Sequence, residues 1–170
     1  MRVRYLVSAN GEHVAKRMSW STQRKVFISH SAQDRAFVVR LTRALQRHGV
    51  RYWYSAQHIK AAQEWHDAIG RALEECNWFV VVLTPAAVRS IWVKRELAFV
   101  LRQRRYNERI IPVLLKSCEF QNLSWTLEEF EFIDFTNDFG KACRQLLRIW
   151  GIKYQPDRVS GKSAPKKKPK

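Results

Sequence analysis

The sequence predicts an α/β domain in which helices cover both faces of a five-stranded parallel sheet. Five short apolar or β-branched runs alternate along the chain with segments whose apolar residues recur at helical spacing. The most apolar run, Trp-Phe-Val-Val-Val-Leu at residues 78–83, is typical of a central strand that is buried on both faces. Strands and helices that alternate in this way form parallel sheets with right-handed crossovers.

The first half of the chain supplies two strands and two helices. Residues 26–29 form an apolar run that ends in a polar turn, which predicts a buried strand. The helix that follows closes at His48-Gly49, since glycine commonly follows a helix C-terminus. Residues 50–54 are β-branched and aromatic and predict a second strand. The apolar stripes of the two helices are Phe37, Val38, Leu41 and Leu45, and then Trp65, Ile69, Ala72, Leu73 and Cys76.

The second half continues the alternation after the strand at 78–83. Thr84-Pro85 breaks that strand, and a third helix is expected from about Ser90 to Arg104. Residues 109–115 predict a fourth strand, in which Pro112 favours a bulge or a position near the sheet edge. The remaining expected elements are a fifth strand at Phe132–Phe135 and a closing helix at Phe139–Trp150.

Charge and composition divide the chain into three parts. The net charge is +16, of which residues 1–25 contribute +5 and residues 153–170 contribute +6. We therefore expect a basic N-terminal extension of unassigned structure (1–24), one folded domain (25–152) and a disordered Lys/Pro-rich tail (153–170). The basic excess lies mostly in the ends of the chain, which weakens an interpretation of the whole domain as a nucleic-acid binder.

Several site classes are disfavoured by the residues present. The three cysteines, Cys76, Cys118 and Cys143, form no CxxC pair, which argues against a disulfide framework or a zinc site and suits a reducing cytoplasm. No apolar stretch has the length of a signal h-region or of a membrane span, so a cytoplasmic protein is expected. The phosphate-binding patterns GxxxxGK and GxGxxG are absent, which argues against a nucleoside triphosphatase or a dehydrogenase.

An ordered set of motifs carries a family resemblance. The motifs are Lys25–Asp34, Trp53-Tyr54, Val80–Pro85, Ser90–Leu97, Ile110–Leu114 and Phe132–Phe135. In this order and spacing they resemble the TIR (Toll/interleukin receptor) domain family, in its prokaryotic stand-alone type with an NAD-cleaving Trp-x-x-x-Glu pattern. The resemblance implies a flavodoxin-like sheet with strand order 2-1-3-4-5. The chain departs from the family in the loop called the BB loop, where Ser55 replaces an acidic residue and Ala61-Ala62 replaces a pair such as Pro-Gly.

The expected site lies where the strands end. In a sheet of this order, ligands bind at the carboxyl ends of the strands, between strands one and three, beside Ser29-His30 and Thr84. Trp92 and Glu96 belong to the helix that starts there, and their i, i+4 spacing places them on one helix face. An aromatic surface with a carboxylate one turn away could hold a ribosyl group.

The resemblance implies a reaction and its residues. Enzymatic TIR domains cleave the nicotinamide–ribose bond of NAD+, and the catalytic glutamate corresponds to Glu96. The implied products are nicotinamide and either ADP-ribose or a cyclic ADP-ribose isomer, with NAD+ as substrate and no cofactor or metal. The implied role is antiphage-type immune signalling or NAD depletion. The substrate-binding residues carried over are Trp92, Phe27, Ser29, His30, Ile59 and Lys60.

Each assigned residue also has a structural interpretation. Glu96 follows Lys94-Arg95 and could be a solvated charge, and Trp92 could pack its helix onto the sheet. His30 could make a structural hydrogen bond in a turn. Asp34 is expected to cap or salt-bridge the first helix. Trp65 is expected in the core.

Two other functions remain open. One is a non-catalytic TIR scaffold that acts through TIR–TIR contacts; self-association is expected in either case, with other TIR proteins as further partners. The other is binding of nucleic acid or acidic membrane by the basic tail, an accessory role that is less favoured than a solvated tail.

Overall fold

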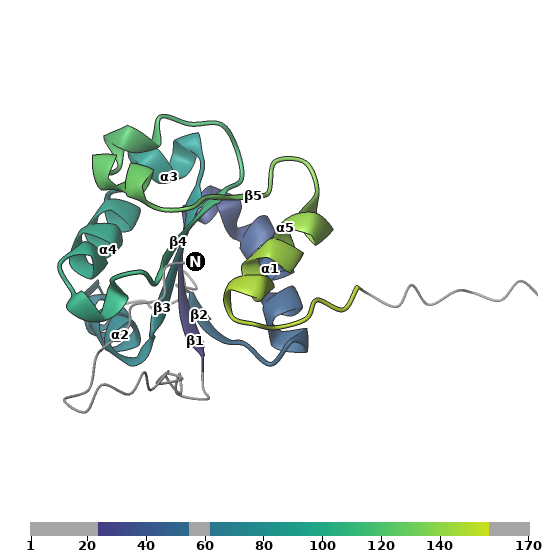
Figure 1. The fold of residues 1–170 in the computed structure, drawn as a ribbon. Helices are drawn as coiled ribbons and strands as arrows, with labels where there is room; N and C mark the ends of the chain where they lie inside the picture. Colours follow the sequence, from purple (N-terminus) through teal and green to yellow (C-terminus); the bar gives the residue numbers. More distant parts are fainter. Residues whose placement is uncertain (1–23, 55–61, 157–170) are drawn as a thin grey trace, which may run out of the picture.

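The computed structural model describes residues 24–54 and 62–156, with only the backbone described for residues 62–66. Figure 1 shows strands and helices alternating along these ranges. The strands are β1 (Lys25–Ser29), β2 (Arg51–Tyr54), β3 (Trp78–Leu83), β4 (Ile110–Leu114) and β5 (Ile133–Asp134). The α-helices are α1 (Arg35–Arg47), α2 (Ala62–Glu75), α3 (Pro85–Arg89), α4 (Ile91–Leu101) and α5 (Phe139–Ile149). Four 3-10 helices complete the set: η1 (Ala32–Asp34), η2 (Arg104–Tyr106), η3 (Phe120–Asn122) and η4 (Trp125–Glu129).

The five strands form one parallel sheet of order β2-β1-β3-β4-β5, which confirms the predicted flavodoxin-like fold. The apolar strand β3 lies at the centre of that order, as its composition predicts. From β1 the chain adds β2 on one side of the sheet and then β3 on the other side. The carboxyl ends of β1 and β3 therefore border the topological switch point, where ligands bind in such sheets.

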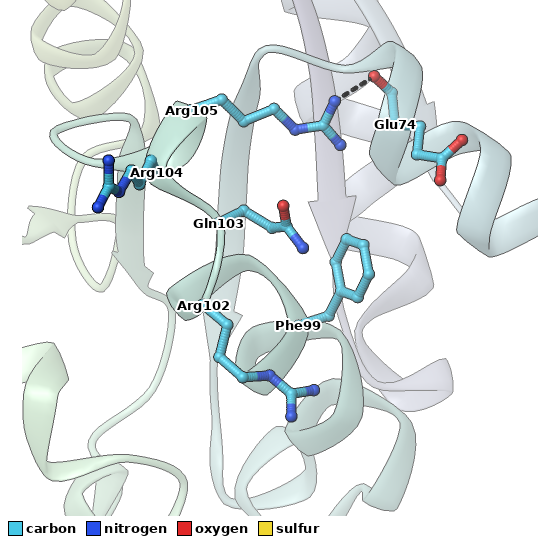
Figure 2. Close-up of a pocket in the computed structure, with 6 residues that line it drawn as sticks. All are labelled: Glu74, Phe99, Arg102, Gln103, Arg104 and Arg105. Carbon is cyan, nitrogen blue, oxygen red and sulfur yellow. Dashed lines mark hydrogen bonds between the residues drawn. The ribbon is translucent and has the colours of Figure 1, made fainter.

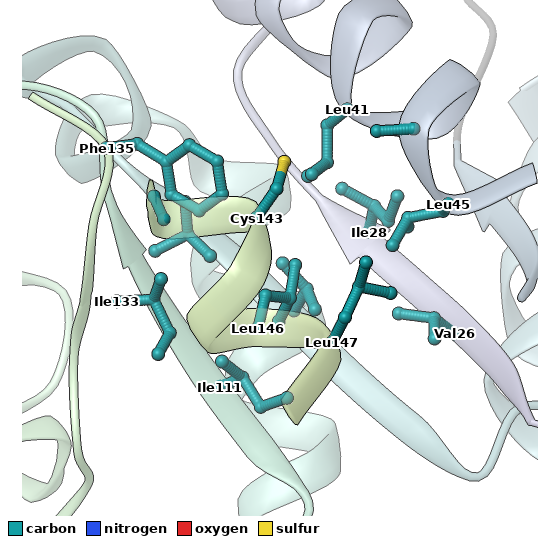
Figure 3. Close-up of a cluster of buried hydrophobic side chains, with 14 of the residues drawn as sticks. Val26, Ile28, Leu41, Leu45, Ile111, Ile133, Phe135, Cys143, Leu146 and Leu147 are labelled. Atoms are coloured by element: carbon teal, nitrogen blue, oxygen red, sulfur yellow. The ribbon is translucent and has the colours of Figure 1, made fainter. Parts of the chain in front are cut away.

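The sheet separates two apolar layers. Helices α1 and α5 cover one face, and Figure 3 shows their side chains converging on Val26 and Ile28 of β1 and Ile111 of β4. Helices α2 and α4 cover the other face, where they pack against Phe27, Phe79 and other inward side chains. Because successive strand residues point to opposite faces, Val26 and Ile28 belong to one layer and Phe27 to the other.

The predicted third helix starts at Ser90 as expected but ends early, and a separate short helix, α3, precedes it. Thr84 caps α3 through a hydrogen bond from the Ala87 N–H, and Pro85 occupies its first turn. Ser90 has an extended backbone (φ −77°, ψ 116°), which ends α3, and its hydroxyl caps α4 at the Val93 N–H. Helix α4 then stops at Leu101, so Arg104 belongs to η2 instead.

The edge of the sheet beyond β4 is short. Strand β5 has two residues instead of the expected four, and it pairs only with Val113 and Leu114. Pro112 pairs with Val81 of β3 and lies in the part of β4 that β5 does not reach. This placement suits a residue that has no N–H to donate to a ladder.

The end of α1 and the segment that follows α5 meet at His48. Gly49 has φ 71°, the left-handed conformation expected of the glycine that closes α1. After α5 the chain returns to this point, where the Tyr154 ring stacks on His48 and the Gln155 N–H donates to His48 Nε2 at 2.8 Å. The predicted terminal segments up to residue 23 and from residue 157 lie outside the described residues. Among the described helices, none has the length and apolarity that a membrane crossing requires.

Candidate functional site

Glu96 lies on the buried face of α4. It shares this face with Val93, Leu97 and Val100, and only 7% of its surface is exposed. Helix α4 packs on the sheet here, and the Glu96 Oε2 atom accepts a hydrogen bond of 2.5 Å from the Ser29 hydroxyl at the end of β1. The interpretation of Glu96 as a solvated surface charge is therefore wrong.

Burial controls the ionisation of this carboxyl group. It raises the pKa of Glu96 to about 7, because the charged form loses hydration, and the hydrogen bond from Ser29 acts in the opposite direction. A carboxyl group that titrates near neutral pH inside an apolar layer is a common feature of functional sites. Glu96 is thus ionised above about pH 7 and protonated below it.

Trp92 lies one turn before Glu96, at the N-terminal end of α4. Its side chain is 37% exposed, so the ring is covered in part and open to a ligand in part. The Arg95 guanidinium lies over the ring at 5.1 Å from its centroid, which is a cation–π distance. The structure therefore places a partly exposed aromatic ring at the end of α4 that is nearer the carboxyl edge of the sheet.

His30 follows Ser29 and makes the structural contact that its turn position suggests. Its Nδ1 donates to the Ile28 carbonyl at 3.3 Å, and its ring meets Tyr54 edge-on at 5.8 Å. Burial lowers the pKa of His30, while the hydrogen bond to Ile28 and the charge of Asp34 oppose this shift. These contacts support a neutral imidazole held beside the end of β1.

Phe27 and Ser29 are less accessible than their assignment as substrate contacts requires. The Phe27 side chain is fully buried, stacked between Trp53 at 4.8 Å and Phe79 at 5.6 Å. The Phe27 side chain points into the apolar layer under α2 and α4. Phe27 therefore supports the site by packing and does not face a ligand. Ser29 is 1% exposed and its hydroxyl is directed to Glu96.

Asp34 and Thr84 form a second buried polar pair at the carboxyl edge. The Thr84 hydroxyl donates to Asp34 Oδ2 at 2.7 Å and accepts the Ala87 N–H at 3.0 Å. Asp34 occupies the N-cap position of α1 but makes no side-chain cap there, so the expected capping bond is wrong. The Thr84-Pro85 dipeptide is a helix-start signal that would have revealed the cap of α3, although not the bond to Asp34.

The remaining predicted contacts belong to the loop that follows β2. Ile59 and Lys60, together with the altered loop positions Ser55 and Ala61, lie outside the described residues. The side chains of Ala62 and Trp65 also lie outside them. Within the described residues, no group of three or more His, Cys, Asp or Glu side chains is arranged to hold a metal ion.

A separate pocket of about 680 Å³ lies near the amino ends of strands β3 and β4, at the opposite end of the strands from Ser29. Its lining residues come from the ends of α2 and α4 and from η2, which lead into the starts of β3 and β4 (Figure 2). The Arg105 guanidinium spans this region and donates to the carbonyls of Glu74 and Leu73, at 2.7 Å each. These bonds occupy the C-terminal carbonyls of α2, which is a helix-capping role. This pocket therefore has no part in the site around Glu96.

Comparison with known proteins connects this geometry to a family. A family model described as TIR domain matches residues 26–147. The 2' cyclic ADP-D-ribose synthase BtTIR of Bacteroides thetaiotaomicron is 30% identical over 89 residues, which cover 51% of this chain and 31% of that protein. The NAD(+) hydrolase TcpC of Escherichia coli O6:H1 is 29% identical over 96 residues, which cover 55% of this chain and 31% of that protein. The match thus spans about a third of the length of these relatives.

Solved structures agree with the fold. The TIR domain of the Toll-related receptor TRR-2 from Hydra magnipapillata superposes with a TM-score of 0.58 at 22% identity, over 72% of this chain and 94% of that one. A TIR-STING receptor from C. gigas gives a TM-score of 0.59 at 23% identity, over 73% of this chain and 38% of that one.

Proposed function

The chain belongs to the TIR domain family, and from this premise we propose that it cleaves the nicotinamide–ribose bond of NAD+. The products are nicotinamide and either ADP-ribose or a cyclic ADP-ribose isomer. The observation that carries the proposal is the buried carboxyl group of Glu96, whose pKa of about 7 sets it apart from a surface charge. Relatives named as cyclic ADP-ribose synthases and NAD+ hydrolases support the same chemistry.

One carboxylate is sufficient for this reaction. Most glycosidases use a second carboxylic acid to protonate the leaving oxygen. In NAD+ the leaving nitrogen belongs to a cationic pyridinium ring, so the electron pair of the breaking C1'–N bond neutralises that ring and no proton is required. The positive charge moves to the ribose, where a nearby carboxylate stabilises it by charge and by a hydrogen bond to a ribose hydroxyl. The apolar layer around Glu96 strengthens this electrostatic stabilisation.

The second half of the reaction determines the product. Water that attacks C1' and loses a proton gives ADP-ribose, whereas a hydroxyl or ring nitrogen of the same molecule gives a cyclic isomer.

We assign Trp92 as the aromatic surface that holds the substrate beside Glu96, because its ring is partly exposed one turn away. His30, Ile59 and Lys60 remain proposed contacts. We further propose that self-association of TIR domains controls the activity, in immune (antiphage-type) signalling or NAD depletion.

The first experiment is an NAD+ cleavage assay of the purified protein at high concentration with a crowding agent. Wild type is compared with Glu96→Gln, which keeps the side-chain shape, and with Glu128→Gln, which removes an exposed carboxylate on η4. We expect nicotinamide release from wild type and Glu128→Gln and none from Glu96→Gln. Mass analysis of the second product separates a hydrolase from a cyclase. Absence of release from a folded wild type would instead favour a non-catalytic scaffold that acts through TIR–TIR contacts.

A further inference from the structure

Ser29 faces Glu96 from the end of β1. It is the last residue of β1, whose backbone pairs with β2 on one side and with β3 on the other, where Ser29 aligns with Val81. Because strand residues alternate between faces, Ser29 points to the same layer as Phe27, under α2 and α4. A small polar side chain thus ends a strand whose preceding residues fill the apolar core.

The Ser29–Glu96 hydrogen bond is short and shielded from solvent. The Oγ–Oε2 distance is 2.5 Å, within the range of hydrogen bonds between a hydroxyl and a carboxylate. Ser29 is 1% exposed and Glu96 is 7% exposed, so little water competes for either partner. The bond joins the central part of the sheet to the middle of α4 and fixes the orientation of the carboxyl group.

We propose that Ser29 is a positioning residue for NAD+ cleavage, whose hydroxyl holds one oxygen of Glu96 and leaves the other oxygen for the ribose. The inference rests on the proposed function of Glu96. It changes the role of Ser29 from a substrate contact to a residue that acts through the carboxylate. The hydroxyl also favours the charged form of Glu96, since it donates to that form, and only the charged form stabilises a cationic ribose.

The proposal predicts a specific kinetic signature. Ser29→Ala removes the donor and leaves the carboxylate buried, so the acidic limb of the pH profile of kcat/KM should move to higher pH. At neutral pH kcat should fall by about 10- to 100-fold, the effect of losing a hydrogen bond to a charged group. KM should change less, because Ser29 stabilises the transition state through Glu96 and does not itself contact the substrate.

Two further variants separate positioning from a general loss of packing. Ser29→Thr keeps the hydroxyl and should retain most of the activity and the wild-type pH profile. Thr42→Val removes another buried hydroxyl, which donates to the Val39 carbonyl within α1 in the other layer, and should leave the pH profile unchanged. Thermal melts of all variants establish that each is folded before its kinetics are compared.

A measurement independent of activity completes the test. Carbon-13 NMR of labelled glutamate follows the titration of the Glu96 carboxyl group, assigned by its loss in Glu96→Gln. A higher Glu96 pKa in Ser29→Ala than in wild type, together with the shifted activity profile, supports the proposal. An unchanged titration and an unchanged pH profile in Ser29→Ala would overturn it. An inactive wild type would overturn the proposed function instead, and the titration would still decide whether Ser29 holds the carboxylate.

Discussion

The Thr84 hydroxyl donates a hydrogen bond of 2.7 Å to the Asp34 carboxylate, which joins two buried residues that are 50 positions apart in the chain. Asp34 precedes α1 and Thr84 follows β3, so the bond connects the segments that leave β1 and β3 at the switch point of the sheet. The same hydroxyl accepts the Ala87 N–H and starts α3. One oxygen atom therefore helps to fix the edge of the sheet beside the candidate site.

Replacement of Thr84 by valine should destabilise the fold. Thr84→Val keeps the side-chain shape but leaves the Asp34 carboxylate without its donor and the Ala87 N–H without its acceptor. We expect a loss of about 2–3 kcal/mol in the free energy of unfolding, measured by urea denaturation. Thr84→Ser keeps the hydroxyl and should lose much less. Equal stability of Thr84→Val and wild type would show that the bond contributes nothing.

Glu96 should lower the stability of the folded protein above neutral pH. Its pKa is about 7 in the folded state against 4.5 for an ordinary glutamate, so its favourable contribution is complete below pH 4.5 and is lost as the pH rises through 7. Glu96→Gln should therefore be more stable than wild type at alkaline pH, by up to about 3 kcal/mol. Thermal melts across this range should show the difference closing as the pH falls toward 4.5. A difference that is constant with pH would contradict the assignment.

The activity of the wild-type protein should depend on pH in the opposite direction. The proposed reaction requires ionised Glu96, and burial raises the pKa of this group to about 7. We expect kcat/KM for NAD+ to rise as the pH increases through 7 and to level off above it. Initial rates of nicotinamide release over this range provide the measurement. A profile that stays flat from about pH 5 to about pH 8 would exclude an essential carboxylate with this pKa.

Tyr106 should stabilise the end of α2. Its fully buried hydroxyl donates to the Leu73 carbonyl at 2.6 Å and lies 3.1 Å from the Cys76 carbonyl. Tyr106→Phe leaves these carbonyls without that donor, and we expect a loss of about 1–2 kcal/mol in the free energy of unfolding. NAD+ cleavage should not change, because η2 lies near the amino ends of the strands, away from Glu96. A loss of activity in a fully folded variant would contradict this separation.

Much of the fold could be predicted because its determinants are local. The uninterrupted apolar run of β3 and the glycine at position 49 each specify their own structure within a few residues. The division between α3 and α4 escaped prediction, because Ser90 was interpreted only as a helix start and not also as the end of a preceding helix. Strand β5 is shorter than its apolar run suggests, since pairing partners determine strand length and the run alone does not.

The site was less predictable because its contacts are between distant parts of the chain. Family resemblance identified Glu96, but the flanking Lys94-Arg95 pair obscured its burial. Only the packed structure shows that Ser29 bonds to Glu96 and that Asp34 bonds to Thr84. Family resemblance placed Phe27 among the substrate contacts, yet the alternation of strand side chains turns it into the core.

The separation of Ser29 and Glu96 by 67 positions also has a consequence for folding. The two residues meet only after β1 has paired with β3 and α4 has docked on both strands, contacts of high sequence separation that close late and slowly. A nascent or partly folded chain would thus lack the assembled carboxyl–hydroxyl pair, even where its helices have already formed. Competence for the proposed chemistry would then require the completed tertiary fold, in which α4 is packed against β1 and β3.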